Sequence, residues 1–210
     1  MTLQQLYERR LASEPARTLT VTTGAIIFDA VACVGLLVAG LYTLNFWCLA
    51  SAAYYLAVGA TRRYLHRRLA TAAWTADLIF ESRVYRRAGM LLGVSGTAYL
   101  ATNLCLYFTE RSSDYPWLAA YSIAVAAFAK CAFAINGFVR AKRSGSPIQV
   151  ALRITNLCDT LVSLAVTQYA LLTLTQFPDA GPASATLGMG FSAIIAVVGV
   201  TMAIRKPRQG

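Results

Sequence analysis

The feature that most constrains this chain is a series of apolar stretches long enough to cross a lipid bilayer as helices. An α-helix rises 1.5 Å per residue, so about 20 apolar residues span a hydrocarbon core of roughly 30 Å. Six stretches approach or exceed this length: Thr22–Leu44, Phe46–Thr61, Ala88–Phe108, Pro116–Val139, Pro147–Phe177 and Ala183–Ile204. We therefore expect an all-α, polytopic membrane protein with six transmembrane helices.

The composition agrees with this class and excludes a soluble globular protein. Hydrophobic residues make up 57% of the chain and charged residues only 13%, whereas about a quarter of an average soluble domain is charged. The apolar content is also too high for a chain that stays disordered in water. An integral membrane protein is the class that remains.

The formal net charge of +10 raises the question of nucleic-acid binding, but the positions of the 19 Lys and Arg residues indicate membrane topology. Basic residues cluster before the first stretch, between the second and third, between the fourth and fifth, and after the sixth. The alternate connections contain Arg111 as their single basic residue. By the positive-inside rule we expect both termini on the cytoplasmic side of the cell membrane, and no nucleic-acid partner.

The segments outside the spans have their own patterns. We expect a cytoplasmic amphipathic segment over residues 1–21, a transmembrane domain over 22–204 and a cytoplasmic tail over 205–210. Within the transmembrane domain, apolar residues recurring every three or four positions predict an amphipathic cytoplasmic helix over about 63–87. A helix of this kind lies on the membrane surface, docks against a partner subunit or a second copy of the chain, or forms a solvated linker. Amphipathicity alone does not distinguish these neighbours.

Three ionisable residues, Asp29, Lys130 and Asp159, lie well inside the expected spans. Each costs roughly 2.5 to 3.5 kcal/mol to insert into a membrane, so each should face the bundle interior beside a partner. Counting residues from the cytoplasmic ends of their helices places all three at a depth of roughly 9 to 15 Å, where they can meet. Two carboxylates with one ammonium would leave one carboxylate able to bind a proton or a cation.

The fifth span also carries a stripe of polar side chains. Its members recur mostly at intervals of three and four residues, which places them on one helix face: Thr155, Asn156, Asp159, Ser163 and Thr167. A hydrophilic pathway would need such a stripe. The same side chains also suit interhelical hydrogen bonds, with Lys130 and Asp159 as a packing ion pair.

Ser146 immediately precedes the fifth span, and Ala151, Thr155, Asp159 and Ser163 follow it within that span. This pattern resembles the fifth transmembrane helix of cation diffusion facilitators, in which a loop Ser is followed by Ala, by His-x-x-x-Asp and by Ser one turn later. The resemblance implies six spans with cytoplasmic termini and the exchange of a divalent cation for protons, with Asp159 as a metal ligand. Thr155 stands where the family has His, which removes the nitrogen ligand that favours zinc.

One motif in the sequence is typical of intramembrane serine proteases. Gly93, Ser95 and Gly96 form a GxSG motif similar to that of rhomboid proteases. A serine nucleophile needs a base within hydrogen-bond reach, and the single histidine, His66, lies in a basic connection. We therefore expect no enzymatic activity. Gly89 and Gly93 also form a GxxxG pattern, which is typical of helix packing.

Two functional hypotheses follow. The first is a transporter that moves a small cation or solute, with Asp159 as ligand or proton carrier and with Asp29 and Lys130 as its charge partners. A divalent cation would then be a substrate, and no cofactor is expected. The second is a non-transporting membrane subunit or scaffold in which the buried charges serve packing. For Asp159→Asn, the first hypothesis predicts lost flux in a folded protein, and the second predicts lost stability.

Overall fold

The computed structural model describes most of the chain between residues 22 and 205. The described residues are 22–38, 40–42, 46–75, 78–109, 121, 124–125, 127–132, 134–135 and 146–205. Among them every regular element is an α-helix: α2 (Phe46–Thr75), α3 (Leu78–Thr109), α5 (Pro147–Leu174) and α6 (Ala180–Ile204). Two further helical parts are called the N-terminal helix, Thr22–Tyr42, and the Lys130 segment, the residues described between 121 and 135.

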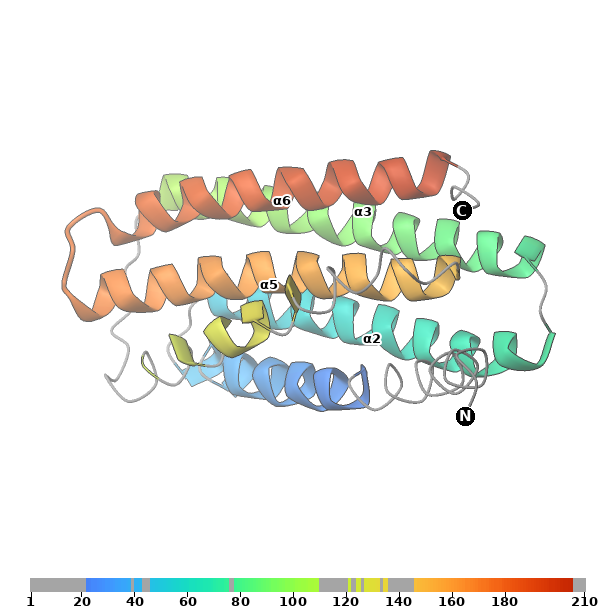
Figure 1. Ribbon diagram of the computed structural model, residues 1–210. Coiled ribbons are helices and arrows are strands. Elements are labelled where there is room, and N and C mark those ends of the chain that lie inside the picture. The colour runs from blue at the N-terminus through green and yellow to red at the C-terminus, as the bar shows by residue number, and fades with distance from the viewer. Residues whose placement is uncertain are drawn as a thin grey trace.

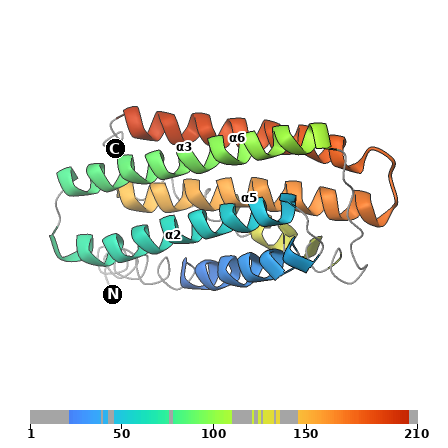
Figure 2. The same cartoon turned by 180° about the vertical axis from the view of Figure 1, so that it is seen from behind.

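The helices lie side by side along one long axis (Figures 1 and 2). α3 packs against α6 along most of its length, α5 lies in the middle of the bundle, and α2 lies between α5 and the N-terminal helix. α2 and α3 run in opposite directions, and so do α5 and α6, as the short connection within each pair requires, whereas α3 and α5 run in the same direction. α5 begins where Pro147 occupies the first helical turn, a position in which proline's missing N–H has no intrahelical partner to lose.

Four helices in the described part of the chain are long and apolar enough to cross a membrane. They are Thr22–Tyr42, Ile79–Phe108, Pro147–Leu174 and Ala180–Ile204. Large apolar side chains on their outer faces, such as Val31, Val94 and Val197, are more than half exposed. Such surfaces are stable against lipid, which supports the predicted class of helical membrane protein.

The predicted amphipathic helix over about 63–87 is not a single element. α2 continues to Thr75 and α3 begins at Leu78, so this stretch is divided between the ends of two antiparallel helices (Figure 2). Its apolar members Leu65, Leu69 and Val84 are buried inside the bundle. The periodicity therefore marks the faces by which α2 and α3 join the core, because neighbouring helices take the place expected of a membrane surface.

Some predictions concern parts of the chain outside this description. The amphipathic segment over residues 1–21 and the tail from residue 206 lie outside the described residues, and so does much of the predicted span Pro116–Val139. Within the described residues, α2 is apolar over its first half only, because arginines follow Thr61.

Glycines bring the backbones of α3 and α6 into direct contact. A Cβ atom added to Gly199 would overlap the backbone of Gly93, and one added to Gly89 would lie 2.6 Å from Met202 Cβ and 2.7 Å from Ala203 N. Where Gly93 faces Gly199, neither helix has a side chain that could separate the two backbones. The predicted packing role of the GxxxG pattern is confirmed, and its partner is α6.

We expect Gly199→Ala to lower the free energy of unfolding by at least about 2 kcal/mol, because the new methyl group forces two helix backbones apart. The measurement is reversible unfolding of the detergent-solubilised protein. Gly190→Ala is the matched control on the same helix, because a Cβ there meets nothing within 4 Å. Equal stability of the two variants would contradict the close packing of α3 and α6.

Candidate functional site

Four charged side chains from four separate segments meet inside the bundle. Asp29 comes from the N-terminal helix, Arg62 from α2, Lys130 from the segment named after it and Asp159 from α5. We call these residues the charge quartet. The side chains of Asp29, Arg62 and Asp159 are only 1–2% exposed, and that of Lys130 is 13% exposed. The quartet is therefore shielded from the surroundings on nearly all sides.

Each cation of the quartet contacts both carboxylates. Arg62 donates one hydrogen bond from Nη1 to Asp29 Oδ2 and another from Nη2 to Asp159 Oδ2, the latter at 2.7 Å. Lys130 Nζ donates to Asp159 Oδ2 at 2.8 Å and to Asp29 Oδ1 at 3.2 Å. The four groups thus form a closed ring with two negative and two positive formal charges. Charge neutrality and hydrogen bonding together make such burial tolerable in a medium of low dielectric constant.

Aromatic and hydroxyl groups complete the surroundings of Lys130. Its Nζ lies 4.3 Å from the centre of the Phe28 ring and 4.8 Å from that of Tyr55, both within the range of cation–π attraction. It also lies 3.4 Å from Ser163 Oγ, which is 2.9 Å from the hydroxyl of Tyr55. The ammonium is therefore held by the two carboxylates and by a polarisable shell on its other sides.

The local sequence explains how Asp29 reaches this place. Thr22, Asp29 and Leu36 are buried and follow one another at intervals of seven residues, whereas most of the N-terminal helix is exposed within the chain. Residues spaced by seven lie on one face, close to two helical turns apart. The N-terminal helix therefore joins the bundle along a narrow seam, and Asp29 provides the charged contact at its middle.

The predicted site residues divide into two groups. The structure brings together Asp29, Lys130, Asp159 and Ser163, as the depth and spacing arguments expected. Thr155 is buried but donates its hydroxyl hydrogen bond to Ala151 O of its own helix at 2.9 Å. Asn156 makes no hydrogen bond with the quartet.

Arg62 is the member of the site that sequence reasoning missed. In the sequence it belongs to the cluster of arginines that follows the second span, a pattern that indicates membrane orientation. A usable signal was nevertheless present, because Arg62 follows Tyr55 and Val58 at helical spacing and precedes Leu65 on the same face, which is buried throughout. Its presence corrects the charge of the predicted cluster from net negative to neutral, so that no carboxylate is left without a cation.

Both carboxylates of the quartet already contact two cations each. Within the described ranges no three side chains of His, Cys, Asp or Glu come together as a metal site would require. A divalent cation at Asp159 would have to displace Arg62 and Lys130, which already contact that carboxylate. A single proton on either carboxylate would instead leave one positive charge in excess. Protonation and opening of the ring are therefore energetically linked.

Comparisons with known proteins complete the description of the site. No protein-family model matches the chain, and neither a curated protein nor a solved structure shows significant similarity to it. The class that the fold and the site define is a helical membrane protein with a neutral charge quartet in its interior.

We expect Arg62→Gln to lower the free energy of unfolding by about 3 to 5 kcal/mol, because two buried carboxylates would then share one ammonium. Reversible unfolding in detergent measures the loss. Arg63→Gln is the matched control, because that neighbouring side chain is exposed and its removal should change stability by no more than about 0.5 kcal/mol.

The double variant Arg62→Gln/Asp29→Asn removes one charge of each sign and should recover part of the stability lost by Arg62→Gln alone. If Arg62→Gln proved as stable as Arg63→Gln, the buried ring of charges would be contradicted.

Proposed function

We propose that the protein is a multi-pass transporter of the cell membrane that moves a small cation or other small solute, with the charge quartet as its proton-responsive site. The observation that carries the proposal is the ring of two carboxylates and two cations in the bundle interior. Asp159 is the proposed proton carrier. Asp29, Arg62 and Lys130 are the groups whose contacts change when it is protonated.

The energetics of burial favour a functional role for these charges. A buried ion pair contributes little net stability, and apolar side chains of similar volume often stabilise a protein more. Ionisable residues inside membrane spans commonly mark substrate or proton pathways for this reason. Each carboxylate takes part in two of the four ion pairs of the ring. Protonating one carboxylate therefore weakens two ion pairs at once and favours an opened ring.

The same contacts favour a proton as the coupled ion. A proton needs no coordination shell and can be taken up by Asp29 or Asp159 without removing either cation from the bundle. A divalent cation, which the resemblance to cation diffusion facilitators implies as a substrate, would need both Arg62 and Lys130 to move away from Asp159. We therefore favour proton coupling. The proposed activity involves neither a cofactor nor an enzymatic step.

The distribution of charge supports a membrane orientation with cytoplasmic termini. Thr23 Oγ1 lies 3.3 Å from His66 Nε2, and Arg86 Nε donates to Ala203 O at 2.8 Å, so the start of the N-terminal helix and the ends of the bundle helices meet. Figure 1 shows this end opposite the turn between α5 and α6, which contains Asp179. Basic side chains gather at it: Arg63, Arg67, Arg68, Arg83, Arg86, Arg87 and Arg205. The positive-inside rule assigns it to the cytoplasm.

The proposed six spans consist of the four apolar helices together with α2 and the Lys130 segment. Both of the added segments contribute a charge to the quartet, so both must lie at the same depth as Asp29 and Asp159. α2 is 30 residues long, which at 1.5 Å per residue exceeds the thickness of the hydrocarbon core. Its basic last turns then lie at the cytoplasmic surface.

A non-transporting membrane subunit or scaffold is the second candidate function. The observation that favours it is the electrical neutrality of the quartet, since a closed ring of ion pairs can join four segments without any exchange of ions. In that case a partner subunit or a second copy of the chain would use the exposed surfaces, and the quartet would only hold the bundle together.

Transport is tested with proteoliposomes that contain a pH-sensitive dye and are exposed in turn to a panel of monovalent cations, divalent cations and small organic solutes. We expect one class of solute to drive proton movement, and Asp159→Asn to reduce that movement to the level of empty vesicles. Asp179→Asn is the matched control. Asp179 is exposed in the turn between α5 and α6, away from the quartet, so its substitution should leave flux unchanged. Asp159→Glu, which retains the charge, should retain part of the flux.

Stability of the same variants separates the two candidate functions. Asp159→Asn leaves Asp29 with two cations, so flux is compared only among preparations that remain monodisperse. If no solute moves protons in the unmodified protein while Asp159→Asn loses most of its stability, the quartet is structural and the scaffold function is supported.

A divalent-cation panel tests the assignment of the coupled ion. We expect magnesium, manganese and zinc ions to produce no ion-specific rise in the thermal unfolding midpoint, because Arg62 and Lys130 already neutralise both carboxylates; a chelator should also have no effect. Stabilisation by one of these ions that disappears in Asp159→Asn would overturn proton coupling and favour the metal-exchange activity implied by the resemblance.

A further inference from the structure

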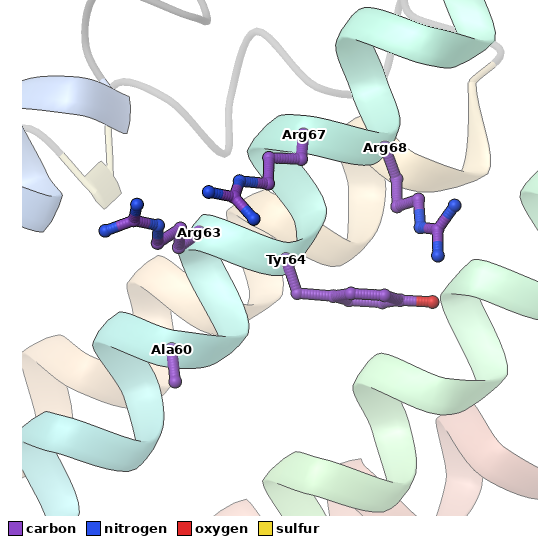
Figure 3. Close-up of a pocket in the computed structure, with 5 residues that line it drawn as sticks. All are labelled: Ala60, Arg63, Tyr64, Arg67 and Arg68. Carbon is purple, nitrogen blue, oxygen red and sulfur yellow. The ribbon is translucent and has the colours of Figure 1, made fainter.

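A second polar site lies on α2, outside the charge quartet. Figure 3 shows a pocket of about 480 Å³ lined by Ala60, Arg63, Tyr64, Arg67 and Arg68. Three of the five lining side chains are guanidinium groups, and none is acidic. Arg63 and Arg67 extend on one side of the helix, and Arg68 lies with Tyr64 on the side of α3, so that positive charge flanks the pocket.

The pocket lies where one exposed face of α2 changes from apolar to basic. The exposed positions on this face follow at intervals of three and four residues: Ala53, Leu56, Ala60, Arg63 and Arg67. Leu56 is 65% exposed, as a side chain facing lipid tails would be. From Ala60 to Arg67 the helix rises about 10 Å, so the change from apolar to basic side chains takes about two helical turns. In the proposed orientation the basic end of this face, at Arg67 and Arg68, lies toward the cytoplasmic headgroups, and the apolar end at Leu56 lies toward the lipid tails.

Aromatic contacts hold one of the guanidinium groups in place. The Arg68 guanidinium carbon lies 5.3 Å from the centre of the Tyr64 ring and 5.7 Å from that of Phe80. A guanidinium that contacts aromatic faces keeps its in-plane N–H groups for an oxyanion. Among the described residues no carboxylate pairs with Arg63 or Arg68, and the nearby Glu81 accepts a hydrogen bond from Ser146 Oγ at 2.7 Å. The pocket thus has donors and charge suited to a phosphate.

We propose that this pocket binds the phosphate-bearing headgroup of an anionic membrane lipid. Arg63 supplies charge-assisted hydrogen bonds to the phosphate oxygens, as arginine does in phosphate sites generally, and the guanidinium groups of Arg67 and Arg68 add positive charge around the pocket. The lipid tails lie along the apolar continuation of the same face at Leu56. This apolar continuation favours a lipid over a free phosphate as the source of the anion. The site is independent of the proposed transport activity.

The test measures lipid binding by the full-length protein in detergent, using native mass spectrometry with equal additions of phosphatidylglycerol and phosphatidylcholine. We expect preferential retention of phosphatidylglycerol, and a loss of that preference by at least about tenfold in Arg63→Gln/Arg67→Gln, since each basic residue near an anionic headgroup contributes roughly fivefold. The control Arg83→Gln/Arg87→Gln removes equal charge from exposed positions at the same end of the bundle and should keep the preference.

Equal losses in the two double variants would show diffuse attraction to basic residues and overturn the site, as would the absence of any preference in the unmodified protein. If inorganic phosphate at the same concentration displaced phosphatidylglycerol completely, the ligand would be a soluble anion and the lipid assignment would be wrong. If Arg63→Gln/Arg67→Gln did not purify in folded form, Arg63→Gln alone should still lower the preference, by about fivefold; an unchanged preference in it would overturn the proposal.

Discussion

The rest of this structure depends on the requirement that charges inside a membrane bundle be neutralised by direct contact. Two carboxylates and two cations meet this requirement only as a closed ring, and the ring needs one side chain from each of four segments. The position of the N-terminal helix follows from it, because that helix has few other buried residues and is joined to α2 and the Lys130 segment through Asp29. α5, the central helix, carries the carboxylate that both cations contact through a single oxygen.

The two sides of the bundle are held together by different physical interactions. α3 and α6 associate through glycines that allow their backbones to touch, an interaction based on packing that involves no charge. The side formed by the N-terminal helix, α2, α5 and the Lys130 segment associates through ion pairs and hydroxyl groups. Glycine packing involves no titratable group, whereas an ion-pair ring responds to protonation. In the proposed transporter this makes the polar side the one that changes, while α3 and α6 remain a rigid support.

Much of the site could be predicted, because burial in a membrane restricts where charged residues occur. Asp29, Lys130 and Asp159 were recognisable as interior residues, and a count of residues per helix placed them at one depth. Arg62 could not be recognised by charge, since an arginine that fixes orientation and one that enters the core look the same in a cluster. Arg62 lies on the buried face of α2, whereas Arg63 lies on the exposed face, and this position distinguishes the two arginines.

The sequence by itself determined the membrane class, the helical secondary structure, the segregation of basic residues and the glycine pattern that packs α3, because each follows from local composition or helical period. Only the tertiary structure decided that residues 63–87 belong to two helices, that α6 is the partner of those glycines, and that Arg62 makes the quartet neutral. These features depend on which helices are neighbours. Helical periodicity specifies the face that each helix buries, but the identity of the facing helix arises from contacts between residues far apart in the chain.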